Sequence, residues 1–164
     1  MTTRLAIIGA GLMGEDHARI FAQEVPGAAL QVICDPDKNR AAAVADKFSA
    51  ADVATDAAAT IARPDVDAVV IASPDFTHAD LTRQCIDAGK RVLCEKPLSQ
   101  QSSECLEVMQ AEVLLNARHV MLGFMRRYDQ SYMDMRAALT GGKLGRALMM
   151  HNFHRNVETP ASDF

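Results

Sequence analysis

The sequence predicts an α/β protein built on a doubly wound parallel β-sheet. Short apolar runs such as residues 68–72 (Ala-Val-Val-Ile-Ala) recur along the chain, as is typical of strands buried on both faces of a sheet. A stretch with helical features follows each run, and this alternation favours parallel strands. The first run also leads into a glycine-rich turn, residues 9–14, that opens the first predicted helix.

The elements alternate in order from the amino terminus. Residues 4–8 (Arg-Leu-Ala-Ile-Ile), which are apolar after Arg4 and end in two β-branched residues, predict the first strand. A helix over residues 12–24 is expected to end at Pro26-Gly27. Further strands are expected over residues 29–34, 51–54, 68–72, 91–95 and 120–124. Further helices are expected over residues 39–48, 57–62, 77–88 and 101–116.

Turn residues mark several of these boundaries. Asp35-Pro36 is expected to end the second strand. Pro64 is expected to end the third helix, because the residue before a proline disfavours the helical conformation. Thr77 is a candidate N-cap for the helix over residues 77–88, and Gly89 suits the position just after it.

The pattern changes after residue 124. A helix is expected over residues 129–139, ended by Gly141-Gly142, and one strand over residues 146–152. About forty residues are too few for a separate domain with its own core. We therefore expect the doubly wound sheet to form one domain over residues 1–124. Residues 125–164 would be a linker helix and the first strand of an incomplete second α+β domain.

The composition is that of an ordinary globular protein. Of the 164 residues, 49% are hydrophobic and 23% charged, and the formal net charge is −4. No basic block stands out, which argues against nucleic acid and membrane partners. Neither a signal peptide nor a membrane span is evident, and the four cysteines form no C-x-x-C pair. These features predict a cytoplasmic protein with reduced cysteines and no metal site.

The glycine turn predicts a phosphate site. Gly9 permits the tight turn, Gly11 lets the backbone approach a pyrophosphate, and Gly14 lets the helix pack close to the strand. Leu12 and Met13 would offer free backbone N–H groups at the positive end of the helix dipole. This combination is the fingerprint of a Rossmann fold, so residues 1–124 are expected to form a dinucleotide-binding domain. An ordinary glycine turn is the alternative, and the strand-turn-helix context argues against it.

Asp35 ends the second predicted strand, about twenty residues past the glycine turn. A carboxylate there would accept the two hydroxyls of an adenosine ribose and repel a 2′-phosphate, so NAD is expected rather than NADP. Arg40 is close enough in sequence to weaken that preference. A second role for Asp35, as a turn residue before Pro36, is compatible with binding.

Two further segments are expected at the ligand crevice. Ser73-Pro74 follows the fourth predicted strand and Glu95-Lys96-Pro97 the fifth, and the carboxyl ends of parallel strands line the crevice of a doubly wound sheet. Lys96 is the candidate for proton transfer, since a neighbouring nicotinamide cation would favour its neutral, proton-accepting form. On pattern alone, Lys96 could equally be a surface lysine in a loop.

Several motifs, with the spacing between them, resemble the Gfo/Idh/MocA oxidoreductase family. They are Gly9-Ala10-Gly11-Leu12-Met13-Gly14, Asp35, Ala72-Ser73-Pro74 with His78, and Gly89-Lys90-Arg91-Val92-Leu93-Cys94-Glu95-Lys96-Pro97. The segment Gly123-Phe124-Met125-Arg126-Arg127-Tyr128-Asp129 and His154-Arg155-Asn156 resemble the inositol dehydrogenase branch.

The resemblance implies roles for individual residues. Lys96 would touch the reacting hydroxyl and the nicotinamide ribose. Three residues would lie near the cofactor, namely Glu95, Ser73 and His78, and three near the substrate, namely Met125, Arg127 and His154. His78 could instead simply occupy the first turn of its helix, and His17 is expected to be a packing or hydrogen-bonding histidine.

The resemblance also implies a segment that we expect this chain to lack. Members of the family carry an Asp-x-x-x-His pair in a complete second domain, where the histidine acts as base and the lysine assists. No such pair follows residue 124 here. We therefore expect a chain that binds the cofactor but has little or no dehydrogenase activity alone, and a homo-oligomer where the second domain is complete.

The leading functional hypothesis is an NAD-dependent oxidoreductase that oxidises a cyclic polyol or sugar, with myo-inositol first among candidates, by hydride transfer to nicotinamide. Amino-sugar and biliverdin-type substrates occur in the same family. A non-catalytic dinucleotide sensor or regulator is the alternative from another class, and a fragment without function is the third.

Overall fold

The fold is a six-stranded parallel sheet with helices on both faces. The structure is a computed structural model that describes residues 2–115, 118–142, 144–153 and 155. The strands are β1 (Thr3–Ile8), β2 (Ala28–Cys34), β3 (Asp52–Ala54), β4 (Ala68–Ile71), β5 (Arg91–Cys94) and β6 (Val120–Leu122). Their order in the sheet is β3-β2-β1-β4-β5-β6, and every neighbouring pair is parallel. The predicted doubly wound sheet is confirmed.

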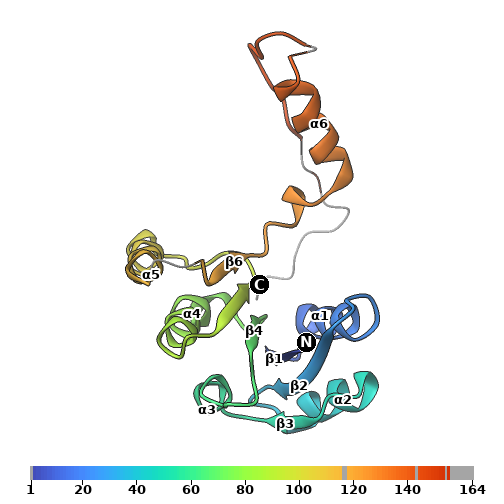
Figure 1. Cartoon of the computed structure of the whole chain (residues 1–164), viewed down its shortest axis with the longest axis vertical. Coiled ribbons are helices and arrows are strands. Elements are labelled where there is room, and N and C mark those ends of the chain that lie inside the picture. Colours follow the sequence, from blue (N-terminus) through green and yellow to red (C-terminus); the bar gives the residue numbers. More distant parts are fainter. Residues whose placement is uncertain (1, 116–117, 143, 154, 156–164) are drawn as a thin grey trace. The chain divides into compact units, whose positions relative to one another are not determined.

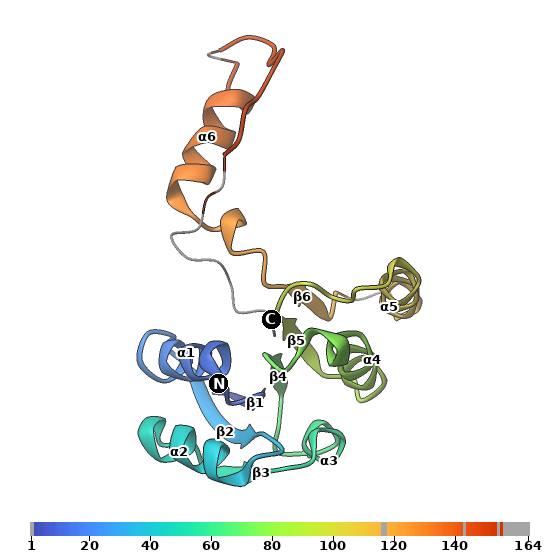
Figure 2. The same cartoon turned by 180° about the vertical axis from the view of Figure 1, so that it is seen from behind.

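The helices of the sheet domain are α1 (Leu12–Gln23), α2 (Lys38–Phe48), α3 (Ala57–Ile61), α4 (His78–Asp87) and α5 (Ser102–Leu114). The helices α1 and α2 cover one face of the sheet, and α3 and α4 cover the other, as Figures 1 and 2 show from opposite sides. The helix α5 packs beside α4. Each helix lies within two residues of its predicted bounds at both ends.

The core consists of two apolar layers, one on each side of the sheet. Alternate residues of β1 enter opposite layers: Ile7 packs toward α1 and α2, whereas Ala6 and Ile8 pack toward α3 and α4. All three are at most 3% exposed. Because both faces of the strands are covered, they have the near-continuous apolar character from which the fold was predicted.

The start of α4 differs from the prediction. A 3₁₀ turn, η1 (Asp75–Thr77), precedes the helix, and Thr77 occupies the N-cap position without a side-chain capping bond. Its hydroxyl instead donates to the carbonyl oxygen of Pro74 at 2.7 Å. At the other end, Gly89 has a φ of +68°, as expected for a glycine that follows a helix.

The chain divides into two compact units, residues 1–124 and 125–164. The second contains the 3₁₀ turn η2 (Met125–Arg127) and the helix α6 (Gln130–Thr140), whose N-cap is Asp129. Asp129 accepts a hydrogen bond from the backbone N–H of Ser131 at 3.1 Å. The helix predicted over residues 129–139 is therefore present.

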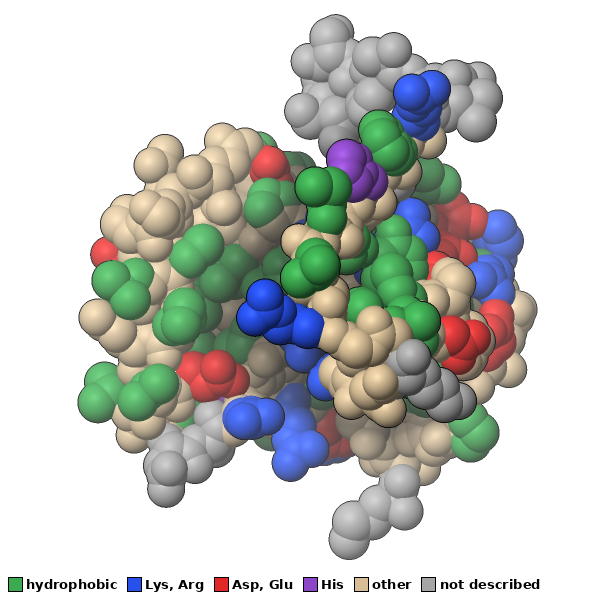
Figure 3. Space-filling view, turned by 90° about the horizontal axis from the view of Figure 1, so that it is seen from above, with side chains coloured by type: hydrophobic (Ala, Val, Ile, Leu, Met, Phe, Trp, Pro, Cys, Tyr) green, Lys and Arg blue, Asp and Glu red, His purple; other side chains and the backbone are tan. Residues whose placement is uncertain are grey.

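The strand predicted over residues 146–152 is wrong: residues 147–153 have no regular secondary structure. Among the described residues of the second unit, no strand runs beside them to pair their backbone groups, and their apolar side chains are exposed, with Leu148 at 83% and Phe153 at 79%. An apolar run becomes a strand only where a neighbouring strand and a packing surface exist. The space-filling view of Figure 3 shows how many hydrophobic side chains reach the surface on one face of the molecule.

Candidate functional site

The carboxyl ends of the strands place the predicted site residues of the first unit along one edge of the sheet. Ile8 at the end of β1 is in register with Cys34 of β2 and Ile71 of β4, and Cys94 of β5 is in register with both Ile71 and Leu122 of β6. The residues that follow these positions therefore share one edge. They are Gly9, Asp35, Ser73, Glu95, Lys96 and Gly123.

The strand order reverses between β1 and β4, because the chain winds outward from this pair in both directions. Such a switch point leaves a crevice at the carboxyl edge of the sheet. Gly9 lies there with a φ of +96°, and a Cβ on it would be 2.5 Å from the carbonyl oxygen of Ala72 at the end of β4. Any side chain at Gly9 would therefore force apart the two strands that border the crevice.

Gly14 and Gly11 have different reasons to be glycine. A Cβ on Gly14 would collide with the backbone carbonyl of Gly9, so Gly14 is required for α1 to pack against the turn. Gly11 has an ordinary φ of −74°, and a Cβ on it would meet nothing within 4 Å. The protein itself therefore gives no steric reason for glycine at this position.

The amino end of α1 is open. Gly11 is the N-cap residue and has no side chain to bond the first N–H groups of the helix, and Leu12 is 85% exposed. Met13 is 43% exposed. Uncapped N–H groups and the positive end of the helix dipole favour an anion here, and an anionic pyrophosphate fits this requirement.

Asp35 is buried, at 5% exposed, beside the glycine turn. Its Oδ2 accepts a hydrogen bond from the backbone N–H of Ala10 at 2.8 Å, and its Oδ1 accepts one from the N–H of Asp37 at 2.9 Å. The guanidinium of Arg40 lies 3.7 Å from Oδ2. A carboxylate can accept about four hydrogen bonds, so Asp35 can brace the turn and still accept from ribose hydroxyls.

The loop after β4 is held by side chains from α4 and η1. Ser73 Oγ lies 2.6 Å from Thr77 Oγ1, and the carbonyl oxygen of Ser73 lies 2.8 Å from Nε2 of His78. His78 is only 2% exposed, and its Nδ1 lies 2.7 Å from the carbonyl oxygen of Pro97. Pro74 is exposed at the start of η1. His78 thus occupies the first turn of α4 and joins the loops after β4 and β5.

Lys96 is exposed to solvent, whereas its neighbour Glu95 is half-buried at the carboxyl edge of the sheet. Glu95 Oε1 lies 2.9 Å from Nε2 of His17 on α1, and Oε2 accepts a 3.2 Å hydrogen bond from the backbone N–H of Lys96. With the described residues, the Lys96 ammonium makes no ion pair. Gly123 is tightly packed against this carboxylate, since a Cβ on it would lie 3.1 Å from Oε1.

Two members of this cluster, His17 and Gly123, were not among the predicted site residues. His17 was expected to be a packing or hydrogen-bonding histidine, and it is both, since its ring also stacks on Phe21. Gly123 lies near the end of the strand predicted over residues 120–124 and opens the segment that resembles the inositol dehydrogenase branch, and these were the available signals. Its contact with Glu95 depends on the pairing of β5 with β6.

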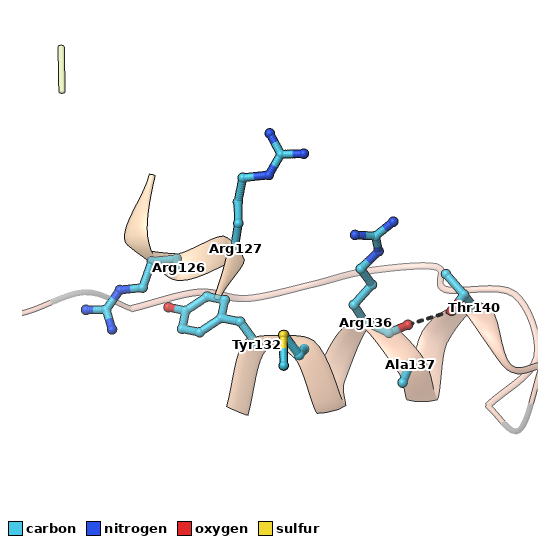
Figure 4. Close-up of a pocket in the computed structure, with 7 residues that line it drawn as sticks. Arg126, Arg127, Tyr132, Arg136, Ala137 and Thr140 are labelled. Atoms are coloured by element: carbon cyan, nitrogen blue, oxygen red, sulfur yellow. Dashed lines mark hydrogen bonds between the residues drawn. The ribbon is translucent and has the colours of Figure 1, made fainter. Parts of the chain in front are cut away.

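The predicted substrate residues lie in the second unit. Arg127 lines an open pocket of about 570 Å³ along α6, together with Arg126, Tyr132, Met133, Arg136, Ala137 and Thr140. Figure 4 shows the side chains of Arg127 and Arg136 extending to the same side, whereas Arg126 lies beside Tyr132. Arg126 also forms an ion pair with Asp129 at 3.2 Å. Met125 is 64% exposed, and His154 lies outside the described residues.

The cysteines take no part in the candidate site. All four are free, and burial raises the pKa of Cys85 to about 12 and that of Cys94 to about 11. The described residues contain no group of three or more His, Cys, Asp or Glu side chains that could hold a metal ion. None of their helices has the length and apolar character that crossing a membrane requires.

The sheet order, the uncapped helix at the switch point and the buried aspartate at the end of β2 define a dinucleotide-binding domain of the Rossmann type. Residues 3–124 match the model of the GFO_IDH_MocA family, described as an oxidoreductase family with an NAD-binding Rossmann fold. The chain belongs to this family.

Among curated proteins, the chain is similar to inositol 2-dehydrogenases. It is 46% identical to inositol 2-dehydrogenase 2 of Saccharopolyspora erythraea over 98% of this chain and 47% of that protein. It is 42% identical to inositol 2-dehydrogenase of Acidothermus cellulolyticus, with the same two coverages. The chain thus spans about half the length of the curated relatives it matches.

Solved structures of inositol dehydrogenases have the same fold. One is myo-inositol dehydrogenase from Lactobacillus casei in complex with NAD(H) and myo-inositol, with a TM-score of 0.85 and 28% identity. Another is myo-inositol 2-dehydrogenase from Lactobacillus plantarum, with a TM-score of 0.83 and 31% identity. In both cases the similarity covers 88% of this chain and 43% of the other.

Proposed function

We propose that this chain is the cofactor-binding part of an NAD-dependent dehydrogenase that oxidises a cyclic polyol or sugar, with myo-inositol as the first candidate. The observation that carries the proposal is the place of Lys96. This exposed amine lies at the same sheet edge as the uncapped glycine turn, two strands away from it. The inositol dehydrogenases among its relatives support the choice of substrate.

Most of the predicted cofactor-binding residues contact the cofactor in this proposal, whereas Glu95 and His78 hold the backbone on either side of Lys96. The turn from Gly9 to Gly14, with the N–H groups of Leu12 and Met13, binds the pyrophosphate, and Asp35 accepts the ribose hydroxyls. Ser73, Pro74 and Lys96 border the nicotinamide end. NAD, when bound, supplies the hydride acceptor.

The residues of the chain then hold the alcohol and take up its proton. Oxidation of a secondary alcohol to a ketone releases a hydride from carbon and a proton from the hydroxyl group. Lys96 lies where its Nζ can contact that hydroxyl and assist in accepting the proton. By their resemblance to the family, Met125, Arg127 and His154 are assigned to binding of the polyol, and Arg127 can donate hydrogen bonds to hydroxyl oxygens.

We further propose that residues 1–164 alone bind NAD but oxidise polyols slowly, because they span only about half the length of the curated relatives. The same proposal includes a cytoplasmic location, for which the free cysteines are suited, and a homo-oligomer for a protein of the relatives' full length. No part of it requires nucleic acid or a membrane.

The test follows the absorbance of NADH while a protein of the relatives' full length that contains this sequence is offered NAD with myo-inositol, other cyclic polyols and common sugars. Oxidation of myo-inositol that is lost on Lys96→Met supports the proposal. Binding of NAD without oxidation of any of these compounds would overturn it and favour a non-catalytic sensor. Failure to bind NAD would exclude both.

A further inference from the structure

Two histidines from different helices hold the residues on either side of Lys96. His17 of α1 lies 2.9 Å from the Glu95 carboxylate, and His78 of α4 lies 2.7 Å from the carbonyl oxygen of Pro97. Glu95 and Pro97 are the sequence neighbours of Lys96. Neither histidine contacts Lys96 itself in these hydrogen bonds.

The hydrogen bond between His17 and Glu95 joins α1, the helix that follows the glycine turn, to the end of β5. The side chains of His17 and Glu95 are 16% and 14% exposed, so their hydrogen bond competes little with water. The second oxygen of Glu95 accepts from the backbone N–H of Lys96, which fixes the peptide that leads into the lysine. Gly123, which follows β6, packs against the same carboxylate, and a Cβ at this position would lie only 3.1 Å from Oε1.

The His78 ring joins the loop after β4 to the loop after β5, because it lies between the carbonyl oxygens of Ser73 and Pro97. His78 is 2% exposed, and its other ring nitrogen lies 2.8 Å from the carbonyl oxygen of Ser73. Carbonyl oxygens only accept, so the imidazole donates to one of them through its single N–H when neutral and to both when both ring nitrogens carry hydrogen, and it packs between the two loops in either form. The backbone of Lys96 is thus fixed from both sides, while its long side chain remains exposed.

We propose that His17 and His78 are positioning residues, which hold the Glu95-Lys96-Pro97 segment so that the Lys96 ammonium reaches the nicotinamide half of the cofactor. This inference rests on the proposed function, since it concerns the place of Lys96 toward NAD. Both histidines act through Lys96, so their effect must vanish when Lys96 has no ammonium group.

A double-mutant cycle on the chain tests this, with NAD and ADP as ligands in isothermal titration calorimetry. ADP has the adenosine and pyrophosphate of NAD but lacks the nicotinamide ribose. We expect His17→Leu to weaken NAD binding about tenfold, which is the value of one hydrogen bond to a charged group, and to leave ADP binding unchanged. In the Lys96→Met background, His17→Leu should cause no further loss.

Two conservative variants and one control complete the experiment. His17→Gln retains a donor for Glu95 and should restore most of the NAD affinity. His78→Gln should weaken NAD binding and spare ADP binding, as His17→Leu does. The control is His119→Gln: His119 lies at the amino edge of the sheet, before β6, with Nδ1 3.2 Å from the Lys90 carbonyl oxygen, and the change should affect neither ligand.

The outcomes separate the two proposals. If the unmodified chain does not bind NAD, the proposed function fails. If the chain binds NAD but His17→Leu lowers the affinities for NAD and ADP equally, or costs as much in the Lys96→Met background as without it, the positioning role is overturned and the proposed function remains. If His78→Gln does not fold, the His17 cycle alone decides.

Discussion

The carboxylate of Asp35 accepts a hydrogen bond from the backbone N–H of Ala10 at 2.8 Å, inside the glycine turn. The residue expected to select the cofactor therefore also fixes the shape of the loop that binds the cofactor phosphates. These two roles lie on one side chain that is 5% exposed. In the proposed function, selection of the adenosine ribose and the geometry of the phosphate site therefore depend on the same side chain.

Asp35→Asn should weaken both properties. The amide has one acceptor oxygen where the carboxylate has two, so one of the N–H groups of Ala10 and Asp37 would face an NH₂ group. We expect a loss of about 1–3 kcal/mol in the free energy of unfolding and at least tenfold weaker NAD binding. Urea denaturation and calorimetric titration measure the two effects.

Asp37→Ala is the matched control for that change. The Asp37 side chain caps α2 by accepting from the N–H groups of Asn39 and Arg40, at 3.0 and 3.3 Å. Its loss should cost about 1 kcal/mol of stability and leave NAD affinity unchanged. Equal NAD affinity in the Asp35 and Asp37 variants would show that Asp35 has no part in cofactor binding.

Substitutions of two glycines in the turn should have different effects, with Gly11→Ala lowering the affinity for NAD and Gly14→Ala lowering the stability of the fold. Gly11→Ala adds a methyl group to open space at an ordinary φ, so the thermal midpoint should be unchanged or slightly higher, while NAD affinity falls at least tenfold. Gly14→Ala places its Cβ on the carbonyl of Gly9 and should destabilise the fold. Thermal melts of both variants, with and without NAD, distinguish these effects, and undiminished NAD binding by Gly11→Ala would contradict the proposed pyrophosphate site.

Lys96→Met should act on the nicotinamide end alone. We expect NAD to bind the chain about tenfold more weakly and ADP to bind as before. In a protein of the relatives' full length that contains this sequence, polyol oxidation should fall by roughly 10²–10⁴, the usual contribution of a positioned acid or base. Lys38→Met removes another exposed lysine, at the start of α2, and should change neither property.

The buried thiols should resist alkylation. Burial raises the pKa of Cys85 to about 12 and of Cys94 to about 11, and it also raises the pKa of Cys34, so few thiolates form near neutral pH. Mass spectrometry after brief iodoacetamide treatment should find label on the half-buried Cys105 only, and on all four cysteines in denaturant. Rapid labelling of Cys94 in the native chain would contradict the buried position of β5.

One ion pair should contribute to the acid sensitivity of the fold. Arg4 bonds Asp67 with Nη2–Oδ1 at 2.8 Å and holds the pKa of that carboxyl well below its usual range. A lowered folded-state pKa stabilises the protein above about pH 4 and loses this effect as the pH falls further. Asp67→Asn should therefore be less stable than the unmodified chain at neutral pH, and the difference should shrink near pH 3 in urea titrations.

The sheet could be predicted because its signals are local. Apolar runs bounded by turn residues mark buried strands, and parallel strands with short βα connections leave few topologies. The strand over residues 146–152 has the same local signal and is absent, since pairing depends on a neighbour that the run itself does not encode.

The site could be predicted in part. Gly9, Asp35 and Lys96 follow strands, and parallel pairing alone brings them to one edge. The contact between His17 and Glu95 joins residues 78 positions apart, and no spacing rule connects a helix residue with the end of a distant strand. The bond from Ala10 to Asp35 likewise depends on the close packing of β1 against β2.

Thermal unfolding of the chain at increasing NAD concentration tests the central claim most directly, since a ligand that binds only the folded state must stabilise it. We predict that the midpoint rises with NAD in the unmodified chain, to a stabilisation of about 2.7 kcal/mol at a hundredfold excess over the dissociation constant, and that it rises less in Gly11→Ala, where at least tenfold weaker binding leaves about 1.4 kcal/mol or less at the same NAD concentration. A folded, cooperatively melting chain whose midpoint does not move with millimolar NAD would contradict the account.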